Sequence, residues 1–156
     1  MKLNLGCGDK KVEGYTGVDL DSRADIVCDI RDLAFCDSNS VDEILSVHVI
    51  EHFYKWQVQG LLWEWRRVLK PGGKIILECP NLELACMAFL QGAPDQFTMW
   101  AFYGNPNLKN ELHCHHWGWT PTTLSEELKQ AGFKDIQSKK AQFKIPTRDM
   151  RVEAIK

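Results

Sequence analysis

Residues Lys2–Ile30 read KLNLGCGDKKVEGYTGVDLDSRADIVCDI and predict the start of a parallel sheet. Leu3–Leu5 is a short strand, and the Gly-Cys-Gly turn at Gly6–Gly8 follows it. Glycine has no Cβ and tolerates positive φ, so the backbone of such a turn can lie close against a ligand. Asp19 ends the next apolar run, at the edge where open parallel sheets bind ligands. Its carboxylate can accept hydrogen bonds from a ribose diol.

Five blocks of the sequence resemble class I S-adenosylmethionine (SAM)-dependent methyltransferases, in the order in which that family has them. They are Leu5–Gly8, Gly17–Asp19, Cys28–Ile30, Ser46–His52 and Val68–Gly73. A lone glycine turn would be a weak signal, whereas five ordered blocks are specific. The resemblance is to the compact, type 11-like members of the family, and it is clearest over residues 1–81 and 119–137.

The resemblance implies an α/β, Rossmann-like fold with a mostly parallel, seven-stranded sheet and an antiparallel last strand. Residues 1–156 then form a single domain, with an insert at residues 82–119 that lines the substrate pocket. The helices that the family places after its first two strands are reduced here. Only Gly6–Gly14 and Leu20–Ala24 connect the first three strands, against the dozen or more residues of a helical crossover.

One face of the sheet should therefore lack helical cover. Lys2 and Asn4 alternate with Leu3 and Leu5, which is typical of a strand with one wet face. We expect a second subunit, in a homodimer, or the insert to cover this face. A monomer with the face open to solvent would contradict that expectation.

The rest of the chain alternates between strand and helix patterns. Strands are predicted at residues 44–47, 74–79, 133–138 and 150–155, and helices at residues 54–69, 82–90 and 121–131. Residues 91–112 contain several Gly, Pro and Asn residues and predict a segment that is largely loop.

Composition narrows the function classes. The chain has 156 residues, 44% hydrophobic, and a net charge of -2 with scattered Lys and Arg, so nucleic acid is not expected as a partner. The six cysteines show no CxxC spacing, which favours reduced thiols and a cytoplasmic location. The first strand follows Met1 at once, which leaves no room for a signal peptide, and no apolar run has membrane-spanning length. We expect no membrane partner.

The resemblance also assigns the cofactor site. The glycine turn and the strand before it would face the methionine end of SAM, the strand-end acid at residue 19 the ribose, and the acid at residue 29 the adenine. The residues so assigned are Asn4, Leu5, Gly6, Cys7, Gly8, Asp19, Leu20, Asp29, Ile30, Arg31 and His48.

Three histidines are candidate catalytic residues. Methyl transfer from a sulfonium is an in-line displacement that needs positioning more than acid-base groups. A neutral imidazole of His48 or His52 could remove the acceptor's proton as the methyl arrives. The alternative is that His48 only lines the cofactor and that His52 starts the next helix. His116 is a candidate because related methyltransferases often have a histidine near the acceptor just before this helix.

The run His113–His116 contains three imidazoles and the thiol of Cys114, which are zinc-ligand types. The run is too compact for all its side chains to converge, and no spaced partner pair is evident elsewhere. We therefore predict no metal site, and expect the segment to close over the acceptor.

The sequence thus predicts a SAM-dependent methyltransferase that methylates an oxygen or nitrogen of a small-molecule or sugar-like acceptor and releases S-adenosylhomocysteine. A catalytically silent SAM-binding or assembly subunit is the alternative. A nicotinamide-dependent oxidoreductase is disfavoured, because Lys11 stands at the third glycine of GxGxxG.

Overall fold

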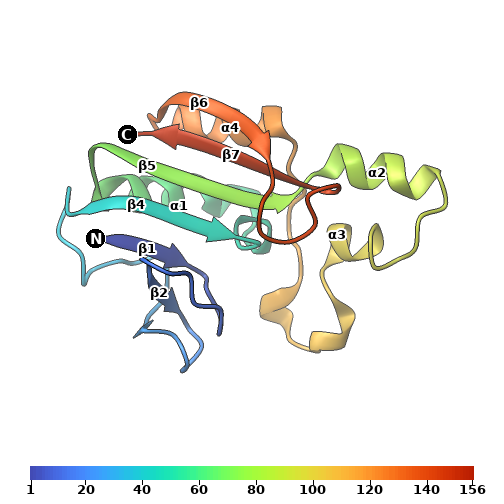
Figure 1. Cartoon of the computed structure of the whole chain (residues 1–156), viewed down its shortest axis with the longest axis horizontal. Coiled ribbons are helices and arrows are strands. Elements are labelled where there is room, and N and C mark those ends of the chain that lie inside the picture. The colour runs from blue at the N-terminus through green and yellow to red at the C-terminus, as the bar shows by residue number, and fades with distance from the viewer.

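The computed structural model describes all residues, 1–156, as one seven-stranded sheet in the order β3-β2-β1-β4-β5-β7-β6 (Figure 1). The strands are β1 (Lys2–Leu5), β2 (Thr16–Asp19), β3 (Ile26–Val27), β4 (Val41–Val47), β5 (Leu69–Pro80), β6 (Lys134–Lys140) and β7 (Asp149–Ile155). The first five are parallel, and β7 runs antiparallel between β5 and β6. The predicted fold class is confirmed.

Four α-helices accompany the sheet. They are α1 (Lys55–Val68), α2 (Leu82–Leu90), α3 (Met99–Tyr103) and α4 (Pro121–Gln130), with short 3-10 turns η1 (Ile50–His52), η2 (Pro106–Leu108) and η3 (Glu111–His113). No helix follows β1 or β2, as the short connections predicted. Within the insert, α2, α3, η2 and η3 lie beyond the carboxyl ends of the strands (Figure 1).

Strand β5 is longer than predicted. It begins at Leu69, which pairs with Val41, and the pairing resumes only between Glu43 and Lys74. The residues between them, Lys70–Gly73, form an irregularity that the strand tolerates because Gly72 adopts a φ of +78°. The Pro-Gly-Gly segment therefore lies inside β5 and interrupts its pairing with β4, instead of preceding the strand.

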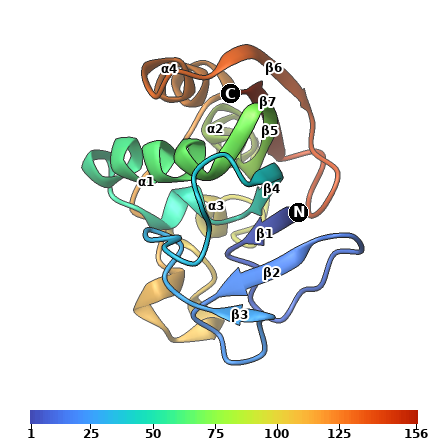
Figure 2. The ribbon, with the colours of Figure 1, turned by 90° about the vertical axis from the view of Figure 1, so that its left-hand side faces the viewer.

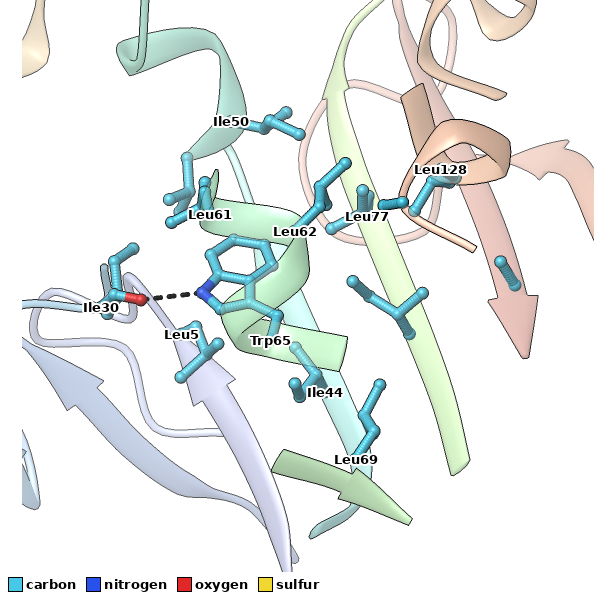
Figure 3. Close-up of a cluster of buried hydrophobic side chains, with 14 of the residues drawn as sticks. Leu5, Ile30, Ile44, Ile50, Leu61, Leu62, Trp65, Leu69, Leu77 and Leu128 are labelled. Carbon is cyan, nitrogen blue, oxygen red and sulfur yellow. Dashed lines mark hydrogen bonds between the residues drawn. The ribbon is translucent and has the colours of Figure 1, made fainter. Parts of the chain in front are cut away.

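Helices α1 and α4 cover the same face of the sheet (Figure 2). The apolar residues of α1 face β4 and β5, and Trp65 lies at the centre of this core with no exposed surface (Figure 3). Its Nε1–H donates to the Ile30 carbonyl at 2.8 Å. Because Trp65 fills the core and satisfies a backbone acceptor, it fixes the loop after β3 against the helix.

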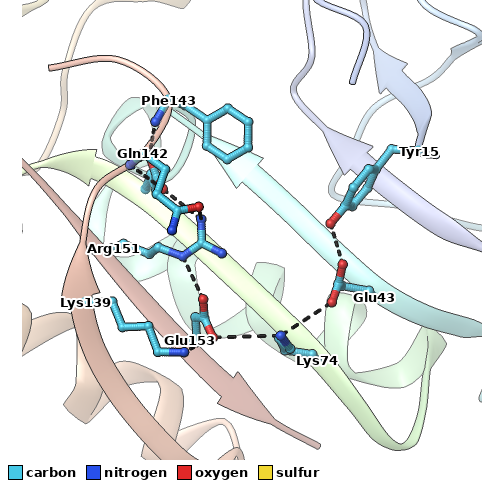
Figure 4. A network of polar contacts seen from close by, with 9 residues as sticks. Tyr15, Glu43, Lys74, Lys139, Gln142, Phe143, Arg151 and Glu153 are labelled. Carbon is cyan, nitrogen blue, oxygen red and sulfur yellow. Dashed lines mark hydrogen bonds and ion pairs between the residues drawn. The ribbon is translucent and has the colours of Figure 1, made fainter. Parts of the chain in front are cut away.

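The other face carries charges where a helix would otherwise pack (Figure 4). Arg151 donates to Glu78 at 2.9 Å and to Glu153 at 2.7 Å. Lys74 lies 3.6 Å from Glu43 and 3.8 Å from Glu153. The expected absence of helical cover is confirmed, and ion pairs within and between neighbouring strands pair the charged groups of this face with one another.

Part of this face is covered by the loop between β6 and β7. The backbone N–H groups of Gln142 and Phe143 donate to the Glu78 carboxylate at 3.0 Å each. The insert, which lies beyond the strand ends, is not the cover, so that half of our expectation was wrong. Asn4, expected on a wet face, is only 5% exposed, and its Nδ2 donates to the Lys10 carbonyl in the loop after β1 at 3.3 Å, so this part of the expectation was wrong. Cover by a second subunit stays a prediction.

We predict that Trp65→Ala lowers the free energy of unfolding by about 3–5 kcal/mol, because it leaves a cavity and an unpaired carbonyl in the core. Urea denaturation followed by circular dichroism measures the loss. Trp63→Ala on the same helix is the matched control, since Trp63 is 61% exposed and its removal should change stability by less than about 0.5 kcal/mol. Equal losses in the two variants would contradict this view of the core.

Candidate active site

The candidate site lies where β1, β2 and β4 end. Gly6 follows β1, Asp19 ends β2, and His48 follows β4. Parallel strands bring their carboxyl ends to one edge, where open α/β sheets bind ligands. Because β7 is antiparallel, its first residue, Asp149, also lies at this edge, opposite Pro80 of β5.

The glycine turn is closely packed on one side and open on the other. Gly6 has a φ of +72°, and a Cβ there would lie 2.3 Å from Cγ2 of Val49. Gly8 has a φ of +54°, but a Cβ there would meet no atom within 4 Å. Gly6 is thus required by the contact with the segment after β4, whereas Gly8 borders free space that a ligand can enter.

Asp19 and Asn4 hold this turn in place. The Asp19 carboxylate accepts from the N–H of Gly8 at 2.7 Å and from the N–H of Asp21 at 2.9 Å. Asn4 donates through Nδ2 to the Lys10 carbonyl at 3.3 Å. The sequence had suggested a ligand role alone for these side chains, and the structure adds that they fix the loop that a ligand would contact.

The thiol of Cys7 faces inward. Burial raises its pKa to about 11, helped by the nearby charge of Asp19. A Cβ on Gly17 would lie 2.8 Å from its Sγ, so the residue at position 17 must be small. Cys7 is therefore a neutral packing residue at neutral pH, and its contribution to the turn is its backbone.

The residues beyond Asp19 offer an apolar surface and a second acid. Leu20 is 57% exposed although apolar, and it stands directly after the strand-end acid. Asp29 pairs with Arg31 at 2.5 Å, and this hydrogen bond lowers the pKa of Asp29. Ile30 is buried, and its carbonyl accepts from Trp65.

These features fit SAM. The free space beside Gly8 can take the methionine end, the acid on the neighbouring strand can take a diol, and the exposed Leu20 gives an apolar surface for a base. The acids of this edge also suit a sulfonium cation.

Beside the turn, His48 pairs with Asp149. His48 has a φ of +57°, and its Nε2–H donates to Asp149 Oδ2 at 2.7 Å. Asp149 also accepts from the Ile145 N–H at 3.0 Å and from Arg148 Nε at 2.7 Å. Burial raises the pKa of Asp149, but the hydrogen bond and the charge of His48, followed by those of Arg148, lower it by more, so the group remains a carboxylate.

Next to this pair, η1 and the insert meet. Glu51 is buried, and its Oε1 lies 3.4 Å from Nδ1 of His48 and 3.9 Å from Nε2 of His115. Nδ1 of His52 lies 3.0 Å from the Cys114 carbonyl. The imidazole rings of His52 and His115 are 4.9 Å apart, centre to centre. Two segments more than 60 residues apart in sequence thus form one cluster.

The structure brings together His48 and His52, but not His116, among the predicted catalytic residues. The His116 ring is stacked on Tyr54 at 4.1 Å, and Tyr54 in turn stacks on Trp56 at 4.4 Å. His115 is the residue of the run that enters the cluster. Its Nδ1–H donates to the Ala101 carbonyl at 2.9 Å, and burial lowers its pKa.

Sequence reasoning missed Asp149 and His115 as members of this edge. The signal for Asp149 was the antiparallel last strand, which puts its first residue beside the ends of the parallel strands. No pattern in the sequence distinguishes His115 from its neighbours, because the contact with Ala101 of α3 selects it.

The insert carries an open hollow of about 510 Å³ between α3 and the segment that carries η2 and η3. Its walls combine aromatic, amide and charged side chains. They are Asp95, Met99, Trp100, Tyr103, Gly104, Asn105, Pro106, Lys109, Asn110, Glu111, His113 and Cys114. This volume lies in the range of small-molecule sites.

Residues 3–77 match the family model of a methyltransferase domain. Similar solved structures are a SAM-dependent methyltransferase from Archaeoglobus fulgidus (TM-score 0.69, 18% identity, covering 99% of this chain and 85% of that chain) and the Burkholderia thailandensis 1,6-didemethyltoxoflavin-N1-methyltransferase with bound 1,6-didemethyltoxoflavin and S-adenosylhomocysteine (TM-score 0.69, 14% identity, 99% and 70%). Human N-acetylserotonin methyltransferase in complex with SAM is a third (TM-score 0.63, 18% identity, 99% and 47%). No curated protein matches the chain significantly in sequence.

None of the helices has both the length and the apolar character needed to cross a membrane. The likeness to the solved structures shows the fold, and the family model covers the strands that carry the glycine turn and Asp19. The whole chain thus has the fold of SAM-dependent methyltransferases, and its residues 3–77 match a methyltransferase domain and carry a site edge that fits SAM.

Proposed function

We propose that this enzyme transfers the methyl group of SAM to an oxygen or nitrogen of a small-molecule or sugar-like acceptor bound between the strand ends and the insert. The observation that carries the proposal is the placement of the His48, Glu51 and His115 cluster between the glycine turn and the insert. A methyl acceptor held there would lie beside the cofactor's sulfur end. The hollow of about 510 Å³ in the insert supports an acceptor of small-molecule size.

In this proposal the turn Gly6–Gly8 and the strand before it hold the methionine end of SAM, as the sequence predicted for residues 4–8. Asp19 accepts hydrogen bonds from the ribose while its carboxylate also holds Gly8. Leu20 lies against the base, and Asp29 with Ile30 and Arg31 form its polar edge. SAM supplies a methyl group that is already activated by the sulfonium charge, so the chain's residues bind, orient and exclude water.

The histidines have separate tasks. His48 lines the cofactor, with Asp149 fixing its ring. His52 is partly exposed, and since its Nδ1–H donates to the Cys114 carbonyl, its Nε2 keeps a free lone pair that could take the acceptor's proton. His116, which the sequence predicted near the acceptor, would contact it only from the exposed stack with Tyr54. A catalytically silent SAM-binding subunit is the second candidate, and turnover separates the two.

We predict that Asp19→Ala weakens SAM binding at least tenfold, because the variant loses both a ribose acceptor and the hydrogen bond that holds the Gly8 N–H. Isothermal titration calorimetry with SAM measures the change. Asp37→Ala, at an exposed position after β3, is the control and should leave the affinity unchanged. If Asp19→Ala binds SAM as the unmodified protein does, the cofactor placement is wrong.

We predict that the protein methylates members of a panel of small hydroxyl and amine acceptors, including sugars, and that His52→Ala lowers kcat by about 10²- to 10⁴-fold while SAM affinity stays unchanged. Release of S-adenosylhomocysteine, corrected for hydrolysis, gives the rate. Lys109→Ala in the wall of the hollow should change KM more than kcat. Tight SAM binding without turnover on any acceptor would favour the silent subunit instead.

A further inference from the structure

Glu51 is a buried carboxylate without a hydrogen bond. The residue is 2% exposed, and neither of its carboxylate oxygens has a hydrogen-bond partner. Its ion-pair neighbours are the imidazoles of His48 and His115, and no Lys or Arg is among them. Burying an ionised carboxylate without hydrogen bonds or a positive charge is strongly unfavourable. A bound cation next to the Glu51 carboxylate would remove this unfavourable burial.

The surrounding imidazoles present lone pairs to this carboxylate. A carbonyl oxygen can only accept, so His52 and His115 carry their protons on Nδ1, where they donate to the carbonyls of Cys114 and Ala101. The Nε2 atom of each ring is then an unprotonated donor of a lone pair. Metal-ligating histidines almost always have this arrangement, in which the other ring N–H donates to a carbonyl or carboxylate.

The neighbouring imidazoles do not satisfy this carboxylate. Nε2–H of His48 is committed to Asp149 at 2.7 Å, and its Nδ1 lies 3.4 Å from Glu51 Oε1 without a hydrogen bond. Nε2 of His115 lies farther away, at 3.9 Å. A bound metal ion would supply the missing positive charge between these atoms.

The distances suit an ion. One ligand atom each of Glu51, His52 and His115 lies within 4.8 Å of the others, and His115 Nε2 is 3.9 Å from Glu51 Oε1. Ligands about 2.0–2.2 Å from a tetrahedral zinc ion lie roughly 3.3–3.6 Å from one another. Small side-chain rotations would therefore bring the three ligand atoms to the distances of a zinc site. His52 is partly exposed, which leaves a route for the ion from solvent.

We propose that Glu51, His52 and His115 bind one divalent transition-metal ion of the zinc type. Two imidazoles and one carboxylate are a donor set of catalytic zinc sites, which keep a further position open. Mg²⁺ and Ca²⁺ prefer oxygen ligands and fit this set poorly. The role of the ion in methyl transfer rests on the proposed function, whereas its binding does not.

In that role, the open position takes the acceptor's hydroxyl oxygen. Val49, which packs on Gly6, keeps the ion's site next to the cofactor turn. The bound hydroxyl loses its proton to water more readily than a free one. The oxygen then forms its bond to the methyl carbon as the bond from that carbon to sulfur breaks. His52 acts as a ligand here, and its removal would slow turnover as predicted above.

Binding is tested without SAM or acceptor. All proteins carry Cys86→Ser and Cys114→Ser, because these two thiols are exposed and could bind zinc themselves. After treatment with chelator, isothermal titration calorimetry with Zn²⁺ and visible absorption with Co²⁺ are recorded for this background, for Glu51→Gln and for His52→Ala. Glu111→Gln, the same change at an exposed carboxylate of the insert, is the matched control.

We expect the background protein to bind one equivalent of Zn²⁺, to give a Co²⁺ spectrum typical of nitrogen and oxygen ligands, and not to bind Mg²⁺. Zn²⁺ binding should be at least tenfold weaker in Glu51→Gln and His52→Ala and unchanged in Glu111→Gln. Circular dichroism shows that the variants are folded. No stoichiometric Zn²⁺ binding, or equal binding in Glu51→Gln, would overturn the proposal. Zinc binding without methyl transfer would instead refute the proposed function, so the two failures are distinguishable.

Discussion

The contact between Gly6 and Val49 joins the two halves of the site. A glycine turn after β1 could serve a cofactor alone, and a histidine cluster after β4 could serve an acceptor alone. Because a Cβ at residue 6 would lie 2.3 Å from the Val49 side chain, the two segments are in direct contact and have no room to move toward each other. In a methyl transfer, where distance and alignment supply most of the rate, such a fixed spacing is what the protein contributes.

Because no helix follows β1 or β2, the sheet face that α1 and α4 do not cover must be stabilised in another way. A sheet face without helices must be stable in contact with water, and here Arg151, Glu153 and Lys74 form ion pairs across β5 and β7. Glu78 is buried and its ion-pair partner is Arg151, so removing Arg151 alone would leave a buried carboxylate without a counter-charge, a change that typically costs about 3–5 kcal/mol. The network stabilises the sheet face that lacks helices and favours the observed register of β7 against β5.

Strand patterns and connection lengths are local properties, so the sequence itself predicted most of the strands and the missing helices. The antiparallel last strand was implied only by the resemblance to the methyltransferase family, and the structure confirms it. The limits of α1 and α2 also agree closely with the predicted ranges. The start of β5 was missed because Pro71 and the glycines after it usually end a pairing, whereas here the ladder resumes after them.

The site was predictable only in part. Gly6, Asp19 and His48 could be placed because they follow strands that meet at one edge. The prediction of no metal site stays untested, but it considered only partners that sequence spacing could reveal. The structure places Glu51 and His52 beside His115, more than 60 residues away in sequence. Which imidazole turns inward depends on backbone contacts of the insert, such as that with Ala101, and these arise only when distant segments pack.

The two chain ends lie at the end of the sheet opposite the carboxyl ends of the parallel strands (Figure 1). The Met1 amino group pairs with Asp42 at the start of β4, and the Lys156 N–H donates to the Gly73 carbonyl at 2.9 Å. An affinity tag, a fluorophore or a surface linker attached at either terminus would consequently point away from the candidate active site. Protein immobilised through either terminus should keep its candidate active site open to the bulk solution, which makes the fold convenient for ligand screening on a sensor chip.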